Sequence, residues 1–143
     1  EVNRLIDKSK DMNLDNVIFK GHRPQVEMGP LLALADVVLI HLASTPHINM
    51  WIPSKTQAYM SAGRPIICNV PGDTSDLINA SGSGICISPG DPKALAQAIL
   101  SMASMSKQSR ENMGLKGAKY YEENLCMEKG INSFISIFEE QIK

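Results

Sequence analysis

The sequence predicts an α/β protein built on an open, parallel β-sheet. Short apolar runs alternate with amphipathic segments along most of the 143 residues. This alternation is typical of parallel strands joined by right-handed helical crossovers. The run at 36–42 is apolar at successive positions, which predicts a strand inside the sheet and covered on both faces. Repeats and low-complexity segments are absent from the sequence.

Each element is predicted from its own local pattern. Period-two or continuously apolar runs bounded by turn residues predict strands at 17–19, 36–42, 65–70 and 85–87. Apolar residues at helical spacing predict helices at 1–13, 24–34, 54–62, 74–80, 92–102 and 106–124, and a last helix with Ile131, Phe134, Ile135 and Phe138 on one face. Gly82-Ser83-Gly84 and Pro89-Gly90-Asp91-Pro92 lack the spacing of a dinucleotide or P-loop site and are interpreted as turns.

Composition excludes several classes of function. Fourteen basic and fifteen acidic side chains give a net charge of −1, so nucleic acid is not expected as a partner. Cys68, Cys86 and Cys126 are far apart and have no zinc-type spacing, which predicts three free thiols, a reducing cytoplasmic location and no metal site. No apolar run reaches the roughly 20 residues of a spanning helix.

Ligands of open parallel sheets bind beyond the carboxyl ends of the strands. This rule points to the loops at 20–24, 43–53 and 70–74. The start of the helix after the second loop carries Ser54, Lys55 and Thr56, where unpaired N–H groups and the helix dipole favour an anion. A diphosphate would fit these groups. The alternative is that Ser54 is only an N-cap and Lys55 a solvated charge.

The loop before this helix is rich in polar groups. His47 is either a general base or, in the alternative that we favour, a hydrogen-bonding or solvated residue. Asn49 adds an amide to the same loop, and Trp51 either stacks on a sugar or forms a hydrophobic staple. In the first loop, Gly21 allows close approach to a flat base, and His22 or Arg23 contacts phosphate or ribose unless these residues are simply solvated.

The ordered set of motifs resembles a known family. These motifs are Asn16-Val17-Ile18-Phe19-Lys20-Gly21, Leu34-Ala35-Asp36-Val37, Pro53-Ser54-Lys55, Ala62-Gly63-Arg64-Pro65-Ile66-Ile67, Gly84-Ile85 and Gly90-Asp91 with Leu95. Together they resemble the carboxy-terminal domain of retaining GT-B glycosyltransferases of family 4 (glycosyl transferases group 1). The Ile-Pro-Ser-Lys version resembles the bacterial branch that builds capsules and lipopolysaccharides.

The resemblance implies a Rossmann-like, three-layer α/β/α fold that forms one half of a GT-B enzyme. It implies that residues 1–143 are a single nucleotide-sugar donor-binding domain, with the amino-terminal acceptor domain and the first strand of this domain lying before Glu1. The implied partners are a nucleotide sugar, UDP-linked in our interpretation, and a carbohydrate or lipid-linked acceptor, which leaves peripheral contact with the inner face of the membrane open. No cofactor is implied, and the isolated fragment is expected to be inactive.

The resemblance also assigns roles to residues. It places the base at Gly21 to Arg23, the diphosphate at the helix that begins at Ser54, and the donor sugar near 46–51, with Lys55 stabilising the leaving group. Two family glutamates correspond to Met50 and Ala58, so the ribose contact is missing or is supplied by Gln57. These departures keep two rivals open: a non-catalytic interaction domain and a sugar-nucleotide epimerase.

Overall fold

The computed structural model describes residues 1–42 and 48–141. Within these residues, three parallel strands form a sheet in the order β1-β2-β3: β1 (Val38–His41), β2 (Ile66–Asn69) and β3 (Gly84–Cys86). In the register, Val38 lies beside Ile66, and Ile66 lies beside Gly84. All four residues of β2 are buried, so the centre of the core lies at this strand.

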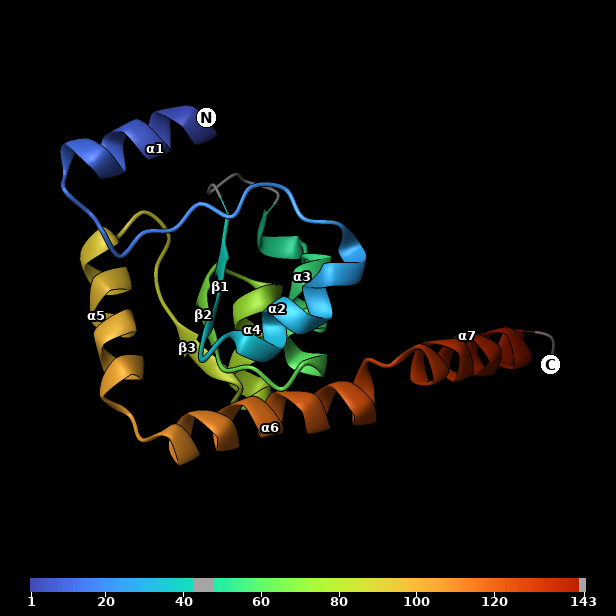
Figure 1. Ribbon diagram of the computed structural model, residues 1–143. Coiled ribbons are helices and arrows are strands. Elements are labelled where there is room, and N and C mark those ends of the chain that lie inside the picture. The colour runs from blue at the N-terminus through green and yellow to red at the C-terminus, as the bar shows by residue number, and fades with distance from the viewer. Residues whose placement is uncertain (43–47, 142–143) are drawn as a thin grey trace.

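Most of the described helices pack around the sheet, whereas the first and the last stand away from it (Figure 1). The helices are α1 (Val2–Asp11), α2 (Met28–Leu34), α3 (Ser54–Ser61), α4 (Asp73–Ser81), α5 (Pro92–Ser104), α6 (Lys107–Asn124) and α7 (Met127–Gln141), with short 3₁₀ turns η1 (Gln25–Glu27) and η2 (Ile48–Met50). Each predicted helix is thereby confirmed, and the helix predicted at 24–34 begins as a 3₁₀ turn.

Two apolar clusters separate the layers. On one face of the sheet, here named the α3 face, Ile40, Ile66 and Cys68 pack with Met60 of α3 and Ile78 of α4. On the opposite face, the α5 face, Ile67 packs with Ala98 and Met102 of α5. The alternation of strand side chains between the faces produces this division. The predicted α/β, three-layer arrangement is confirmed.

Two predictions about strands are wrong. Val17, Ile18 and Phe19 form no strand but lie in an irregular segment, and their side chains are exposed by 38 to 71%. Apolar, β-branched composition makes a strand only where another strand is available for pairing, and none lies beside them in the part of the chain that the structure describes. Moreover, among the described strands β1 lies at an edge of the sheet rather than inside it, and Leu39 is 41% exposed.

Candidate functional site at the carboxyl edge of the sheet

Three helices begin at the carboxyl edge of the sheet. After β1, β2 and β3 end, the chain enters the loops that lead to α3, α4 and α5. The helix starts therefore gather at one end of the sheet, and each presents backbone N–H groups that have no partner inside the helix. Which of them can take a ligand depends on what already occupies these groups.

The start of α3 is not occupied by a side chain. Its N-cap is Pro53, and among the described residues no side chain makes a capping hydrogen bond to the first turn, so the interpretation of Ser54 as an N-cap is wrong. Ser54 is exposed and Lys55 is half-buried. No acidic residue lies in the first turn, which leaves the positive end of the helix dipole uncompensated by the helix's own side chains.

The starts of α4 and α5 differ from that of α3 because both carry carboxylates. Asp73 and Asp76 lie in the first turn of α4. In α5, the carboxylate of Asp91 accepts hydrogen bonds from the backbone N–H groups of Lys93 and Ala94, both at 2.9 Å. Carboxylates therefore already complement these two helices and would repel a second anion. Of the three, α3 is the start that suits an anion.

Thr56 and Gln57 take different positions in the first turn of α3. Thr56 is fully buried, and its hydroxyl has no hydrogen-bond partner among the described residues. Gln57 is exposed. Ser54 rather than Thr56 therefore presents a hydroxyl to the surface at this helix start.

The loop before α3 is held by the start of α4. The hydroxyl of Thr74 donates a hydrogen bond of 2.8 Å to the carbonyl of Trp51. Gly72 has φ +72°, and a Cβ built on it would lie 2.1 Å from the carbonyl oxygen of Asn49. These contacts fix Asn49 and Trp51 next to the start of α3, while both side chains stay exposed. The indole of Trp51 is 61% exposed, which disfavours its role as a staple.

Gly72 and Thr74 were not predicted as individual site residues. Their segment, 70–74, is one of the loops to which the rule for carboxyl edges points. Their role depends on contacts with residues more than twenty positions earlier in the chain. The available signal is the place of this loop after a strand, and no local pattern identifies the residues that it contacts.

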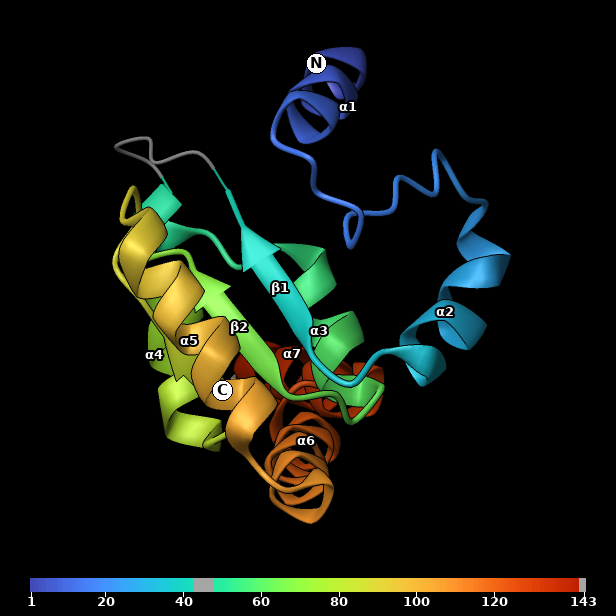
Figure 2. The same cartoon turned by 60° about the vertical axis from the view of Figure 1, so that its left-hand side comes forward.

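The first of the three predicted loops, 20–24, stands apart from the sheet (Figure 2). Gly21 has φ +69°, and Gly21, His22 and Arg23 are all exposed. The guanidinium of Arg23 donates to the carbonyl of Lys20 at 3.2 Å and pairs with Glu27 at 3.5 Å. Its described polar contacts therefore stay within its own segment, which stands away from the sheet in Figure 2. His47 lies outside the described residues.

Two thiols lie under the loop that holds Gly72. Cys68 and Cys86 are register partners on β2 and β3. Cys68 donates to the carbonyl of Val70, and Cys86 donates to that of Ser75, both at 3.5 Å. The neighbouring thiol of Cys68, together with burial, raises the pKa of Cys86 above its ordinary value. All three cysteines are free, as predicted, and the described residues contain no group of three or more side chains suited to a metal.

The fold and this edge define a class of protein: a Rossmann-like α/β unit in which α3, at the carboxyl ends of the strands, begins without a side-chain cap or an acidic residue in its first turn. Residues 1–105 match the family model described as glycosyl transferases group 1, and the chain belongs to this family. The resemblance read from the sequence is thereby confirmed at the level of the family.

A solved structure confirms the fold. The chain is similar to sucrose-phosphate synthase from Thermosynechococcus elongatus, with a TM-score of 0.81 and 18% sequence identity over 98% of this chain. The match covers 34% of that protein, so the chain spans about a third of its length. The likeness identifies a fragment of a GT-B fold. No curated protein sequence matches the chain, and none of the described helices has the length and apolar character that a membrane crossing requires.

Proposed function

We propose that this chain is the donor-binding domain of a retaining glycosyltransferase that uses a UDP-linked sugar. The observation that carries the proposal is the start of α3, which lacks a side-chain cap and an acidic residue and carries Lys55. Membership of the glycosyl transferases group 1 family supports the class of reaction. The acceptor is a carbohydrate or a lipid-linked sugar of surface polysaccharide synthesis, so the whole protein works in the cytoplasm at the inner face of the membrane.

In this proposal the diphosphate of the donor binds the first turn of α3. Its oxygens accept hydrogen bonds from the free N–H groups and from the hydroxyl of Ser54, and Lys55 contributes a positive charge. When the sugar leaves, negative charge grows on the diphosphate, and groups already placed around it stabilise that charge. Lys55 is therefore the catalytic residue of the proposal, through stabilisation of the leaving group.

In this proposal the other predicted residues bind the remaining parts of the donor. Asn49 and Trp51 lie in the segment that Gly72 and Thr74 hold against the start of α4, and with His47 they contact the donor sugar in this proposal. Gln57 is exposed on the first turn of α3 and takes over the ribose contact, since Met50 and Ala58 stand where the family has glutamates. Gly21, His22 and Arg23 hold the base.

A titration with UDP tests the anion site. Lys55→Ala should weaken UDP binding by about 10- to 150-fold, because a charge-assisted hydrogen bond contributes about 1.5–3 kcal/mol. Lys93→Ala is the matched control: Lys93 also lies in the first turn of a helix at this edge, but Asp91 already caps that helix. Binding can be followed by calorimetry or by amide chemical shifts.

Two outcomes would contradict the proposal. The first is an absence of heat and shift changes at millimolar UDP while the fold is intact. The second is equal weakening by Lys55→Ala and Lys93→Ala, which would indicate only a general loss of positive charge.

A non-catalytic domain with the same half-fold is the second candidate, favoured by Met50 and Ala58 at the positions of the family's glutamates. An assay of donor hydrolysis and sugar transfer with the protein from the complete gene separates the two. Turnover above background excludes the non-catalytic candidate, and UDP binding without turnover supports it.

A further inference from the structure

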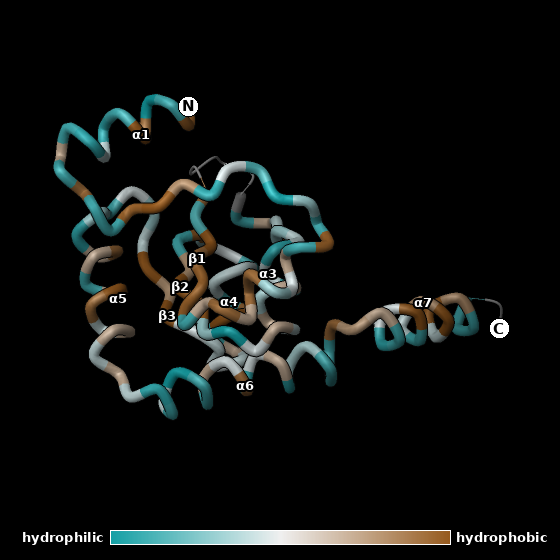
Figure 3. Tube along the Cα trace, viewed as in Figure 1, coloured by the Kyte–Doolittle hydropathy of each residue, from teal (hydrophilic) through white to brown (hydrophobic). Residues whose placement is uncertain are grey.

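Cys68 and Cys86 form a pair of thiols that the proposed function does not use. Cys68 lies on β2 and Cys86 on β3, and the two residues are register partners in the sheet. Both side chains pack in the apolar cluster on the α3 face, so they leave their strands on the same side. Figure 3 shows hydrophobic residues along β2 and β3 at the centre of the molecule. The two thiols are therefore neighbours in an apolar environment.

The spacing of the two strands permits a disulfide between these residues. Neighbouring strands lie about 4.7–4.9 Å apart, and disulfides join residues whose Cα atoms are about 4.4–6.8 Å apart. The Cβ atoms of a relaxed disulfide are slightly closer than the strands, at about 3.5–4.5 Å, so β3 must shift a little toward β2. Strand β3 has three residues and pairs only with β2 among the described strands. A bond formed in this way is strained and easily reduced.

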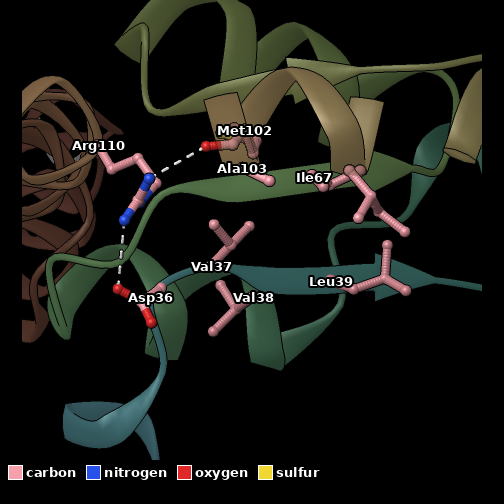
Figure 4. Close-up of a pocket in the computed structure, with 9 residues that line it drawn as sticks. Asp36, Val37, Val38, Leu39, Ile67, Met102, Ala103 and Arg110 are labelled. Atoms are coloured by element: carbon pink, nitrogen blue, oxygen red, sulfur yellow. Dashed lines mark hydrogen bonds and ion pairs between the residues drawn. The ribbon is translucent and has the colours of Figure 1, made fainter. Parts of the chain in front are cut away.

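A small molecule reaches the pair from the side of Cys86. Cys68 is fully buried, whereas Cys86 is half-buried and lines a cavity of about 270 Å³, together with residues of α4 and of the segments that follow β2 and β3. A larger cavity, of about 470 Å³, lies on the opposite face of the sheet. Figure 4 shows Ile67 of β2 beside Met102 of α5 there. Because successive side chains of a strand alternate between the faces, Cys68 points away from that cavity.

The two thiols differ in acidity. The neighbouring thiol of Cys86 lowers the pKa of Cys68 by hydrogen bonding, and burial acts in the opposite direction. In return, the neighbouring thiol of Cys68 and burial raise the pKa of Cys86. The thiolate is the nucleophilic form of cysteine. Cys86 therefore reacts slowly with an oxidant, whereas Cys68 is prepared to attack Cys86 once that residue is oxidised, and for this attack Cys68 needs no access to solvent.

We propose that Cys68 and Cys86 are an oxidation site, at which a hydroperoxide that enters beside Cys86 joins the two sulfur atoms in a reversible disulfide. With hydrogen peroxide, the sulfur of Cys86 takes one oxygen atom and becomes a sulfenic acid, and the other oxygen leaves as water. The sulfur of Cys68 then attacks that of Cys86, the S–O bond breaks and a second water leaves. In sum, the two thiols lose two hydrogen atoms, and the peroxide is reduced to two waters.

The disulfide would alter the loop above the two thiols. Each thiol donates a hydrogen bond of 3.5 Å to a carbonyl, one to that of Val70 and the other to that of Ser75. These two residues flank Gly72 and Thr74, which hold the loop before α3. A disulfide carries no S–H group, so both hydrogen bonds are lost on oxidation. The oxidation site thus lies beneath the candidate donor site, although the chemistry of the thiols does not depend on the proposed function.

Cys126 provides an internal control. It follows α6, donates to the carbonyl of Glu122 at 3.3 Å and does not line the cavity beside Cys86. Its thiol should therefore remain available when the other two are joined.

Thiol counting tests the bond in the folded 143-residue chain. After treatment with millimolar hydrogen peroxide, alkylation in denaturant should label one of the three thiols, the mass before alkylation should be lower by two hydrogen atoms, and peptide mapping should link Cys68 with Cys86. Dithiothreitol should restore all three thiols. Alkylation of all three after peroxide would overturn the proposal. A link to Cys126, a link between two chains, or a link that forms only in the unfolded chain would also overturn it.

Three variants test the roles of the thiols, with circular dichroism as the check of the fold. Cys126→Ser should form the bond as the original chain does, and this variant leaves the core unchanged. Cys68→Ser should stop at a sulfenic acid on Cys86, which dimedone traps. Cys86→Ser should leave Cys68 reduced, because Cys68 is fully buried. Oxidation of Cys68 in Cys86→Ser at the rate of the original chain would overturn the entry of peroxide beside Cys86.

Amide chemical shifts test the effect on the loop. On oxidation, the amides of Gly72 and Thr74 should shift more than that of Ala98, which packs on the α5 face of the sheet. Unchanged shifts at Gly72 and Thr74 in the chain that carries the disulfide would overturn this effect. The measurement needs no UDP, so its failure is distinguishable from a failure of the proposed function.

Discussion

At the scale of the residue, Gly72 decides how the loop before α3 is placed. It combines a left-handed backbone, with φ +72°, and a backbone contact with Asn49 that leaves no room for a Cβ. Glycine is the residue that tolerates both conditions. Together with the bond from Thr74 to Trp51, this contact joins the start of α4 to the residues that lead into α3.

Substitution of Gly72 should therefore lower the free energy of unfolding by more than the strain of its backbone angle alone would. Gly90 is the matched control, because it has φ +76° but open space around it. Gly90→Ala should lower the free energy of unfolding by about 1 kcal/mol through the strained angle. Gly72→Ala should cost at least about 2 kcal/mol more, because the Asn49 backbone must move. Urea unfolding followed by circular dichroism measures both values. Equal losses would show that the contact with Asn49 contributes nothing to stability.

At the scale of the element, α6 packs closely against the core through two glycines. Gly114 and Gly117 are its buried residues. A Cβ on Gly114 would lie 2.0 Å from the carbonyl oxygen of Gly63, and a Cβ on Gly117 would lie 2.8 Å from the Cβ of Ser83. The absence of side chains at these positions allows the helix backbone to approach the turn after α3.

Alanine at position 114 should separate these two elements. Gly114→Ala should destabilise the protein by about 2 kcal/mol or more, since a rigid backbone carbonyl must be displaced. Gly130→Ala on α7, where a Cβ would meet nothing within 4 Å, should leave the unfolding free energy unchanged or slightly higher, because alanine favours a helix. Thermal unfolding of the two variants tests this difference. A loss of stability in Gly130→Ala as large as that in Gly114→Ala would contradict it.

At the scale of the whole molecule, α7 extends away from the sheet (Figure 1). None of its described residues is buried. Its apolar side chains at helical spacing, Ile131, Phe134, Ile135 and Phe138, are 48 to 66% exposed. The described residues therefore leave this apolar face uncovered.

Removal of residues 127–143 should leave the fold intact. The melting temperature of the chain that ends at Cys126 should lie within about 2 °C of the original, because the deleted helix contributes no buried side chain. Its tendency to self-associate should fall, since an exposed apolar face is removed. Calorimetry and analytical ultracentrifugation measure the two effects. A fall of many degrees would mean that α7 stabilises the domain through contacts with α6.

Much of the fold could be predicted from local patterns. The strand at 65–70 and the helices from 54 and from 92 follow from apolar spacing and from caps such as Asp91, which act within a few residues. The strand predicted at 17–19 failed for the opposite reason. Its composition suits a strand, but a strand exists only when another segment pairs with it. The exposed edge of β1 could not be foreseen on the same ground.

For the candidate site, the sequence by itself determined the chemical groups: a hydroxyl and an ammonium at a helix start, and a polar loop before it. It also determined the order of the strands and helices that form, because apolar spacing and turn residues indicate each element along the chain. Only the tertiary structure decided that Gly72 and Thr74 hold Asn49 and Trp51 beside the start of α3, and that β1 lies at the edge of the sheet formed by the described strands. These features depend on contacts between residues far apart in sequence, which no local pattern encodes.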